Sequence, residues 1–145
     1  MSAVFPGGVC AVTCALPGSR HEIFRFLADI ENLPRWAGDF CSELELSRGR
    51  WLAYSPTGEA FVELDADERT GTIDLKWSGD RGEVRMLPLR IMALPGGQTL
   101  LCAIFLPRPG IDEITLERDA ASLAAALRDL EAVLQAVTSR RRLAG

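Results

Sequence analysis

The feature that most limits how this chain can fold is one apolar stripe near its C-terminus. Apolar side chains recur there at alternating spacings of four and three residues, which is the period of one face of an α-helix. They are Leu116, Ala120, Leu123, Leu127, Leu130, Leu134 and Val137. The pattern predicts a helix from Asp112, a residue suited to cap its first turn, to Thr138. A helix on the order of 40 Å long needs a broad apolar surface to pack against.

A run of strands upstream of this helix supplies that surface. The periodicity switches to two at residue 39, and strand-like segments then follow one another, separated by turns that contain glycine or proline. They cover residues 39–46, 50–55, 59–67, 72–77, 83–94 and 98–106. Connections this short favour antiparallel neighbours, because a parallel crossover needs about a dozen residues or more. The pattern therefore predicts an antiparallel meander.

Alternation along the strands separates two faces of this meander. Within residues 59–67 one parity is apolar and the other is acidic. The apolar set is Val62, Leu64 and Ala66; the opposite face carries Glu63, Asp65 and Asp67, together with Asp74 and Lys76 of the next strand. We therefore expect one dry face and one charged, solvated outer face without an apolar docking patch. Pro88 interrupts residues 83–94, which predicts a bulge or an edge position there.

The N-terminal part adds one strand and two short helices. Residues 9–16 are a β-rich run, and Ser19 to Glu22 has the Ser-x-x-Glu form of a helix capping box. A helix with one apolar stripe follows, and a second short helical piece covers residues 31–36. The predicted class is α+β: a curved antiparallel sheet wrapped around a long C-terminal helix, with two short helices after the first strand. We expect one domain over residues 1–145, with its core at about 9–138 and a basic tail at 139–145.

Several local segments, taken in order, carry a family resemblance. Residues 29–36 are similar to the second short helix of the START-like proteins, also called the SRPBCC superfamily, and residues 62–65 to their central strand. Residues 94–99 resemble their late hairpin, and 109–119 the lead into their terminal helix. The resemblance spans about residues 9–137 and implies the helix-grip fold. It also implies a cavity between sheet and helix, where members of this superfamily, polyketide cyclases among them, bind lipids, sterols, polyketides or plant hormones.

Charge and motif content argue against several classes of function. A net charge of −4 and an isoelectric point near 5.0 disfavour nucleic-acid binding, which needs a concentrated positive field. No apolar run approaches the roughly 20 residues that span a bilayer, and the N-terminus lacks a positively charged signal start, so we expect a cytoplasmic protein without a membrane span. Neither His21 nor the cysteines have metal-ligand spacing, and no phosphate loop or nucleophile motif is present. We expect no cofactor.

Aromatic and long apolar side chains are the natural lining of a cavity in such a fold. The candidates are Trp36, Phe40, Trp51, Phe61, Trp77, Met86, Phe105, Leu123 and Leu127. The alternative for each of them is that it simply fills the core. Arg85 and Arg90 are strand arginines that would bind a ligand carboxylate if they face inward. Tyr54, the single tyrosine, either orients a ligand carbonyl or keeps its hydroxyl in solvent.

The leading hypothesis is a protein that binds a small hydrophobic molecule, such as a lipid, a polyketide or an aromatic compound. It would act as a carrier, a sensor or a polyketide cyclase-like enzyme. No catalytic constellation is evident, so an enzyme would have to work by folding a ketone-bearing substrate in a dry cavity. The alternative is a protein-interaction module with a filled, non-binding core. The sequence leaves open whether the chain forms a homodimer.

Overall fold

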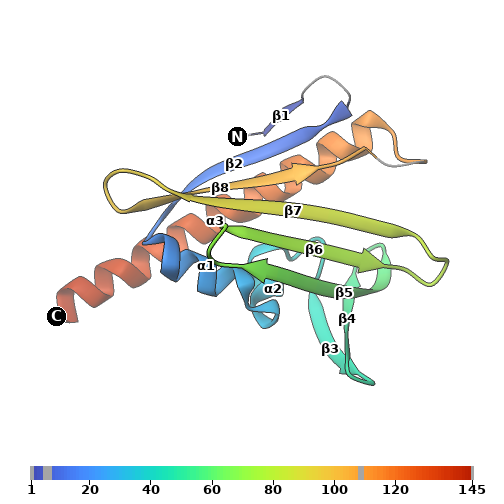
Figure 1. Ribbon diagram of the computed structural model, residues 1–145, viewed down its shortest axis with the longest axis horizontal. Helices are drawn as coiled ribbons and strands as arrows, with labels where there is room; N and C mark the ends of the chain where they lie inside the picture. Colours follow the sequence, from blue (N-terminus) through green and yellow to red (C-terminus); the bar gives the residue numbers. More distant parts are fainter. Residues whose placement is uncertain (1, 5–7, 108–109, 145) are drawn as a thin grey trace.

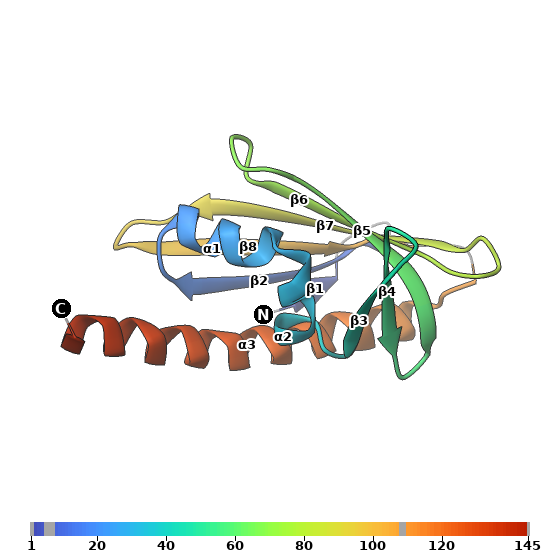
Figure 2. The ribbon, with the colours of Figure 1, turned by 90° about the horizontal axis from the view of Figure 1, so that it is seen from below.

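The computed structural model describes residues 2–4, 8–107 and 110–144. One antiparallel sheet curves over one long helix, in the order β1-β2-β8-β7-β6-β5-β4-β3 (Figures 1 and 2). The strands are β1 (Ser2–Val4), β2 (Cys10–Pro17), β3 (Glu43–Ser47), β4 (Arg50–Ser55), β5 (Gly58–Asp67), β6 (Thr72–Ser78), β7 (Val84–Ala93) and β8 (Gln98–Phe105). The helices are α1 (Arg20–Ala28), the 3₁₀ turn η2 (Ile30–Asn32), α2 (Leu33–Trp36) and α3 (Glu113–Ala144). This is the predicted helix-grip architecture.

The apolar stripe of α3 forms the centre of the core. The helix runs along the concave side of the sheet and packs mainly on β2 (Figure 2). Five stripe residues are buried and a sixth, Leu134, is partly buried; the buried ones are Leu116, Ala120, Leu123, Leu127 and Leu130. The side chain of Val137 lies outside the described residues. Each large side chain buried in this way contributes about 1.5–3 kcal/mol relative to an exposed one.

Both predicted helix caps are present. The Ser19 hydroxyl accepts a hydrogen bond from the Glu22 backbone N–H at 3.2 Å, at the start of α1. The Asp112 carboxylate accepts one from the Thr115 N–H at 2.8 Å, at the start of α3. α3 is longer than predicted, because it continues to Ala144 through the basic segment. These caps satisfy backbone donors that would otherwise lack partners and fix where each helix begins.

Three local predictions differ from the structure. The strand expected from residue 39 begins only at Glu43, because residues 37–41 form a hydrogen-bonded turn after α2. On β5 the inner face is buried at Val62, half-buried at Leu64 and exposed at Ala66. The inner face of the sheet is therefore no longer packed against other residues at this end of the strand. The sheet also gains β1, which pairs with β2.

Pro88 lies at an edge position, one of the two arrangements predicted for it. β7 is continuous through Pro88 on its β6 side, where Pro88 is the partner of Asp74. Its pairing with β8 begins only at Leu89, opposite Ala103. A proline is tolerated here because its missing N–H interrupts no ladder with β8.

In the part of the chain that the structure describes, no helix combines the length and the apolar character that crossing a membrane requires.

Candidate functional site

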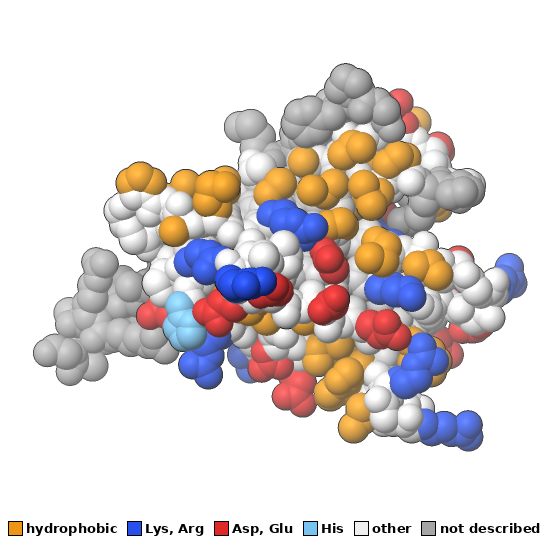
Figure 3. Space-filling view, in the orientation of Figure 1, with side chains coloured by type: hydrophobic (Ala, Val, Ile, Leu, Met, Phe, Trp, Pro, Cys, Tyr) orange, Lys and Arg blue, Asp and Glu red, His pale blue; other side chains and the backbone are white. Residues whose placement is uncertain are grey.

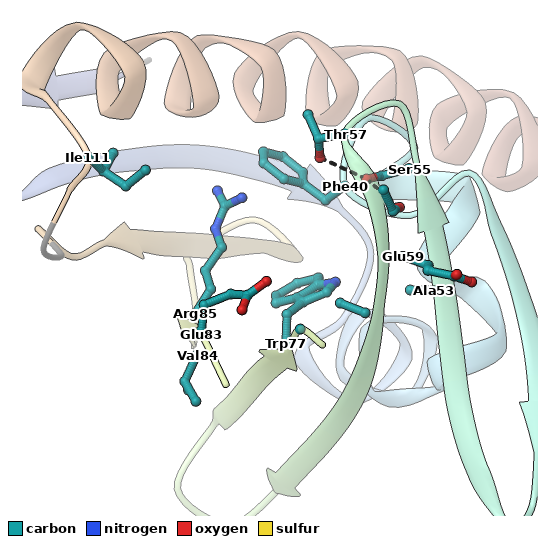
Figure 4. Close-up of a pocket in the computed structure, with 13 residues that line it drawn as sticks. Phe40, Ala53, Ser55, Thr57, Glu59, Trp77, Glu83, Val84, Arg85 and Ile111 are labelled. Carbon is teal, nitrogen blue, oxygen red and sulfur yellow. Dashed lines mark hydrogen bonds between the residues drawn. The ribbon is translucent and has the colours of Figure 1, made fainter. Parts of the chain in front are cut away.

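At one end of the sheet, β4 and β5 bend away from β7 and β8 (Figure 2). A cavity of about 550 Å³ lies there (Figure 4). It is lined by Phe40, Ala53, Ser55, Thr57, Gly58, Glu59, Ala60, Trp77, Gly79, Glu83, Val84, Arg85 and Ile111. Small residues on the neighbouring strands β4 and β5 leave the space open, since Ala53 and Ala60 are register partners on the inner face. The volume falls within the usual range for small-molecule pockets.

Two aromatic rings form the main walls of this cavity. Trp77 is on β6 and is only 9% exposed, because it shares the inward parity of Ile73 and Leu75. Phe40 projects from the turn after α2, and its ring lies 6.2 Å from the buried ring of Phe105. The walls are therefore apolar and are supported from behind by the core.

Arg85 supplies a partly buried positive charge to the cavity. It shares the inward parity of Leu87 on β7, and Figure 4 shows its guanidinium directed into the space beside Phe40. The guanidinium carbon lies 4.6 Å from the Phe40 ring centre, within the range of a cation–π interaction. Its Nη2 donates a hydrogen bond to Asp119 of α3 at 3.0 Å, and the two side chains are 24% and 23% exposed. Arg85 is thus a fixed, charge-balanced group rather than a mobile surface arginine.

Arg90, the other arginine predicted as an anchor, lies on the outer face. It pairs with Asp74 at 2.8 Å, and its side chain is 46% exposed. Because Arg85 and Arg90 have opposite parities on β7, only Arg85 reaches the cavity.

The remaining polar groups of the cavity lie at its exposed rim. The Glu83 carboxylate folds so closely over Gly79 that a β-carbon there would collide with it, and it points towards Trp77 in Figure 4. Glu59 is exposed on β5, and the Ser55 and Thr57 hydroxyls lie 3.0 Å apart. Among the described lining residues, Arg85 is thus the only charged group that is partly buried, and no buried acid and base face each other.

Tyr54 does not face this cavity. Its neighbour Ala53 points inward, so the Tyr54 side chain points outward, where its hydroxyl donates a hydrogen bond to the Glu45 carboxylate. This hydrogen bond raises the pKa of Tyr54 to about 12, because it favours the neutral hydroxyl. Tyr54 therefore belongs to the surface of the β3–β4 hairpin.

The structure places the nine predicted lining residues in different environments. Phe40 and Trp77 line the cavity, and Phe105 packs behind Phe40. Trp36, Leu123 and Leu127 are fully buried in the core. Trp51 lines a separate hollow beside residues 28–30, and Phe61 lies under the Arg50 guanidinium, 3.9 Å from the ring centre. Met86 is 40% exposed and projects from β7 with the parity opposite to Arg85.

Sequence reasoning did not single out the small residues that create the cavity. Ala53, Ala60 and Val84 line it, and so does Ile111 from the lead into α3. Their signal was weak, because alanine on an inward strand position predicts a packed core as well as an open one. Only the curvature of the sheet decides between the two.

A second, wider groove of about 870 Å³ lies between α1 and α3. Its floor is apolar and includes Phe26, Leu130 and Val133, of which Val133 is 58% exposed. Its rim carries exposed polar and charged side chains, which are those of His21, Glu22, Arg25, Arg35 and Asp129. This groove is an exposed trough between two helices and has no half-buried polar group comparable to Arg85.

The outer face of the sheet corrects the expectation of a wholly charged surface. Register places Met92, Leu100 and Ala15 in one row on this face, and Ile104 and Ala11 in another. Pro88, which has the same outward parity as Met92, extends the second row just before the β7–β8 pairing begins at Leu89. Apolar side chains gather over β2, β8 and the neighbouring end of β7, whereas charged side chains cover β6 and β5 (Figure 3). We call the six residues of these two rows the apolar strip. Most are half-buried, and Met92 is 62% exposed.

Comparison with known proteins identifies the fold. No protein-family profile and no curated protein matches the chain. A START superfamily protein from Mycobacterium smegmatis is 14% identical with a TM-score of 0.62, over 89% of this chain and 98% of that one. A Rhodobacter sphaeroides protein is 19% identical with a TM-score of 0.65, over 94% and 99%. The Aha1 dimer from Colwellia psychrerythraea is 11% identical with a TM-score of 0.63, over 86% of this chain and 93% of that one. The chain therefore has the START-like fold that its sequence predicted.

Proposed function

We propose that this protein binds a small hydrophobic molecule in the cavity walled by Phe40 and Trp77, with Arg85 as the polar group that orients it. The observation that carries the proposal is the combination of an open apolar space with one fixed, partly buried cation. A site of this kind contributes affinity through apolar burial and orientation through a single polar contact.

The polar groups of the cavity favour binding over catalysis. General acid–base chemistry needs groups held within hydrogen-bonding reach of a reacting atom and tuned by a dry environment. The carboxylates here, Glu59 and Glu83, lie at the exposed rim. A guanidinium group presents only hydrogen-bond donors, so Arg85 serves to bind and orient a ligand rather than to transfer protons. A carrier or sensor accords with this arrangement better than a cyclase.

The cavity is favoured over the groove between α1 and α3, although that groove is larger. An apolar molecule gains most where surrounding side chains remove it from water on several sides. Trp77 is almost fully buried, while Val133 on the floor of the groove is mostly exposed. The rings of Phe40 and Trp77 also offer flat surfaces for aromatic ligands.

A pair of matched variants tests the location of the site. Ala60→Phe adds a ring to the cavity, and Val133→Phe adds one to the groove. With acetylnaphthalene as probe in equilibrium dialysis, we expect Ala60→Phe to weaken binding at least about tenfold. Val133→Phe should change it by less than about threefold. The reverse pattern would assign binding to the groove, and circular dichroism checks that both variants fold.

Native mass spectrometry of the freshly purified protein addresses the natural ligand. An apolar molecule that co-purifies with the wild-type protein, but not with Ala60→Phe, would support the proposal directly. Any ligand that binds only the folded state should also raise the melting temperature in proportion to its concentration over its Kd. If none of the probes binds, the ligand-binding proposal fails and a role in protein interaction is favoured instead.

A protein-interaction role is the second candidate, and the apolar strip favours it. We propose a second copy of the chain as the partner, because a two-fold axis through this face would bring each strip onto the other. The Aha1 protein of similar fold is described as a dimer. The two rows of the apolar strip flank a row formed by Arg90, Cys102 and Thr13. Apolar residues that gather on a sheet face often mark such contacts.

Analytical ultracentrifugation over a concentration series tests the dimer. We expect wild type to associate, and Met92→Lys to shift it to monomer by inserting a charge at the strip. Leu46→Lys is the matched control, because Leu46 is similarly exposed at 60% but lies on β3, at the opposite edge of the sheet. A wild-type protein that stays monomeric throughout the series would rule out the second candidate.

A further inference from the structure

We infer that the cavity selects an apolar ligand with a neutral oxygen acceptor, such as a ketone, ester or alcohol, and discriminates against carboxylates. This inference rests on the proposed function, since it names the class of ligand that the same cavity takes. An inward-facing arginine by itself would suggest a carboxylate ligand, which is the opposite preference. The difference comes from the charges that already surround Arg85.

Asp119 already balances the charge of Arg85. It holds the guanidinium from the α3 side, at 3.0 Å, and it is not among the residues that line the cavity. Both side chains are about three-quarters buried. A ligand carboxylate would therefore either displace Asp119, leaving a partly buried carboxylate unpaired, or place a second negative charge beside it. Both outcomes cost binding free energy.

The rim adds further negative charge. Of the described residues that line the cavity, Glu59 and Glu83 are acidic and Arg85 is basic. The Glu83 carboxylate points towards Trp77, so a ligand that stacks on Trp77 lies close to it (Figure 4). An anionic ligand thus meets an excess of like charge at the mouth, which lowers both its local concentration and its affinity.

A neutral oxygen avoids these costs. It accepts a hydrogen bond from the guanidinium, which presents several N–H donors in one plane, while Asp119 keeps its ion pair. A hydrogen bond to a charged donor is stronger than one between neutral groups. An ammonium ligand would interact favourably with the acidic rim. At the inner end of the cavity, however, it would lie beside the guanidinium, which carries the same charge and offers no hydrogen-bond acceptor.

Three probes with one aromatic body separate these classes in the wild-type protein. They are acetylnaphthalene, naphthoate and naphthylmethylammonium, which present a ketone, a carboxylate and an ammonium group. Equilibrium dialysis at physiological salt gives each Kd. We expect the ketone to bind at least about tenfold more tightly than the carboxylate, and more tightly than the ammonium.

Asp119→Asn tests the cause of this preference. Asparagine keeps the shape and an oxygen that accepts from Arg85, but it removes the balancing charge. We expect naphthoate to gain at least about tenfold in affinity, with acetylnaphthalene changing less than about threefold. Asp129→Asn is the matched control on the same helix, since Asp129 lines the other groove, and it should leave both affinities unchanged.

The outcomes are distinguishable. Wild type that binds naphthoate or the ammonium probe more tightly than the ketone would overturn the inference and leave the proposed function standing. An unchanged ratio in Asp119→Asn, with the variant folded, would also overturn it. If no probe binds wild type, the proposed function fails and this inference with it. The ratio of the Kd values of ketone and carboxylate is measured on the wild-type protein. It therefore tests the inference even if Asp119→Asn does not fold.

Discussion

Gly71→Ala is expected to lower the free energy of unfolding by about 2 to 5 kcal/mol, the combined cost of a left-handed backbone and a steric overlap. Gly71 has a φ of +70°, which alanine adopts only with strain. A β-carbon at this position would lie 2.4 Å from the carbonyl oxygen of Ile91 on β7. That oxygen is backbone in the middle of the sheet, and Ile91 donates its own N–H to the Gly71 carbonyl at 2.9 Å. Neither partner can move without breaking the ladder.

Urea denaturation of Gly71→Ala beside Gly96→Ala isolates the overlap from the backbone strain. Gly96 has a similar φ of +84°, but nothing lies within 4 Å of the place where its β-carbon would be. Its replacement should cost only about 1–2 kcal/mol. Equal losses of unfolding free energy in the two variants would contradict this prediction. They would show that β7 shifts at Ile91 and relieves the overlap with the new β-carbon.

Leu127→Ala is expected to destabilise the protein by about 2–5 kcal/mol, because it leaves a void at the centre of the core. Leu127 is fully buried, and it faces the sheet from the middle of α3. It lines none of the cavities described above, so its role is packing rather than ligand contact. Thermal and urea unfolding, followed by circular dichroism, give the change in free energy.

Val133→Ala is the control for Leu127→Ala. It makes a similar truncation on the same helix at a side chain that is 58% exposed. Its effect should stay within about 0.5 kcal/mol. A loss for Leu127→Ala that is no larger than that for Val133→Ala would contradict the packing of α3 on the sheet.

The fold was predictable because its signals are periodic and local. The stripe from Leu116 to Leu130 required a sheet, and the glycine and proline turns divided that sheet into strands whose observed bounds differ from the predicted ones by a residue or two in most cases. Capping residues such as Ser19 and Asp112 fixed the helix starts, because their hydrogen bonds involve only neighbouring residues. None of these signals depends on how strongly the sheet curves.

The cavity was only partly predictable, since its position depends on that curvature. Trp77 was identifiable from the alternation along β6, and Arg85 was one of two candidates. Parity could not choose between Arg85 and Arg90, because Pro88 lies between them and made the phase of the strand beyond it uncertain. Phe61 was misleading for a related reason: a large aromatic residue on a strand reads as core, yet here it covers the outer face beneath Arg50.

The apolar strip escaped prediction because β8 is apolar at both parities. Leu101 and Ala103 face the helix, while Leu100 and Ile104 face outward, so no alternation marks the two sides. Only the charged strands β5 and β6 gave a readable outer face. A strand with two apolar faces is itself a sign that both faces are covered or bind something.

The edge position of Pro88 divides β7 into two halves that are held differently. Among the described residues, 84–88 of β7 pair in the sheet with β6, whereas the strand from Leu89 onward pairs with both β6 and β8. Segments with fewer cross-strand hydrogen bonds open at lower free energy than the centre of the same sheet. Arg85 lies in this singly paired half, and the rest of β7 anchors the core. The strand thus combines a stable half that maintains the fold with a more easily opened half beside the cavity, through which the proposed ligand would enter and leave.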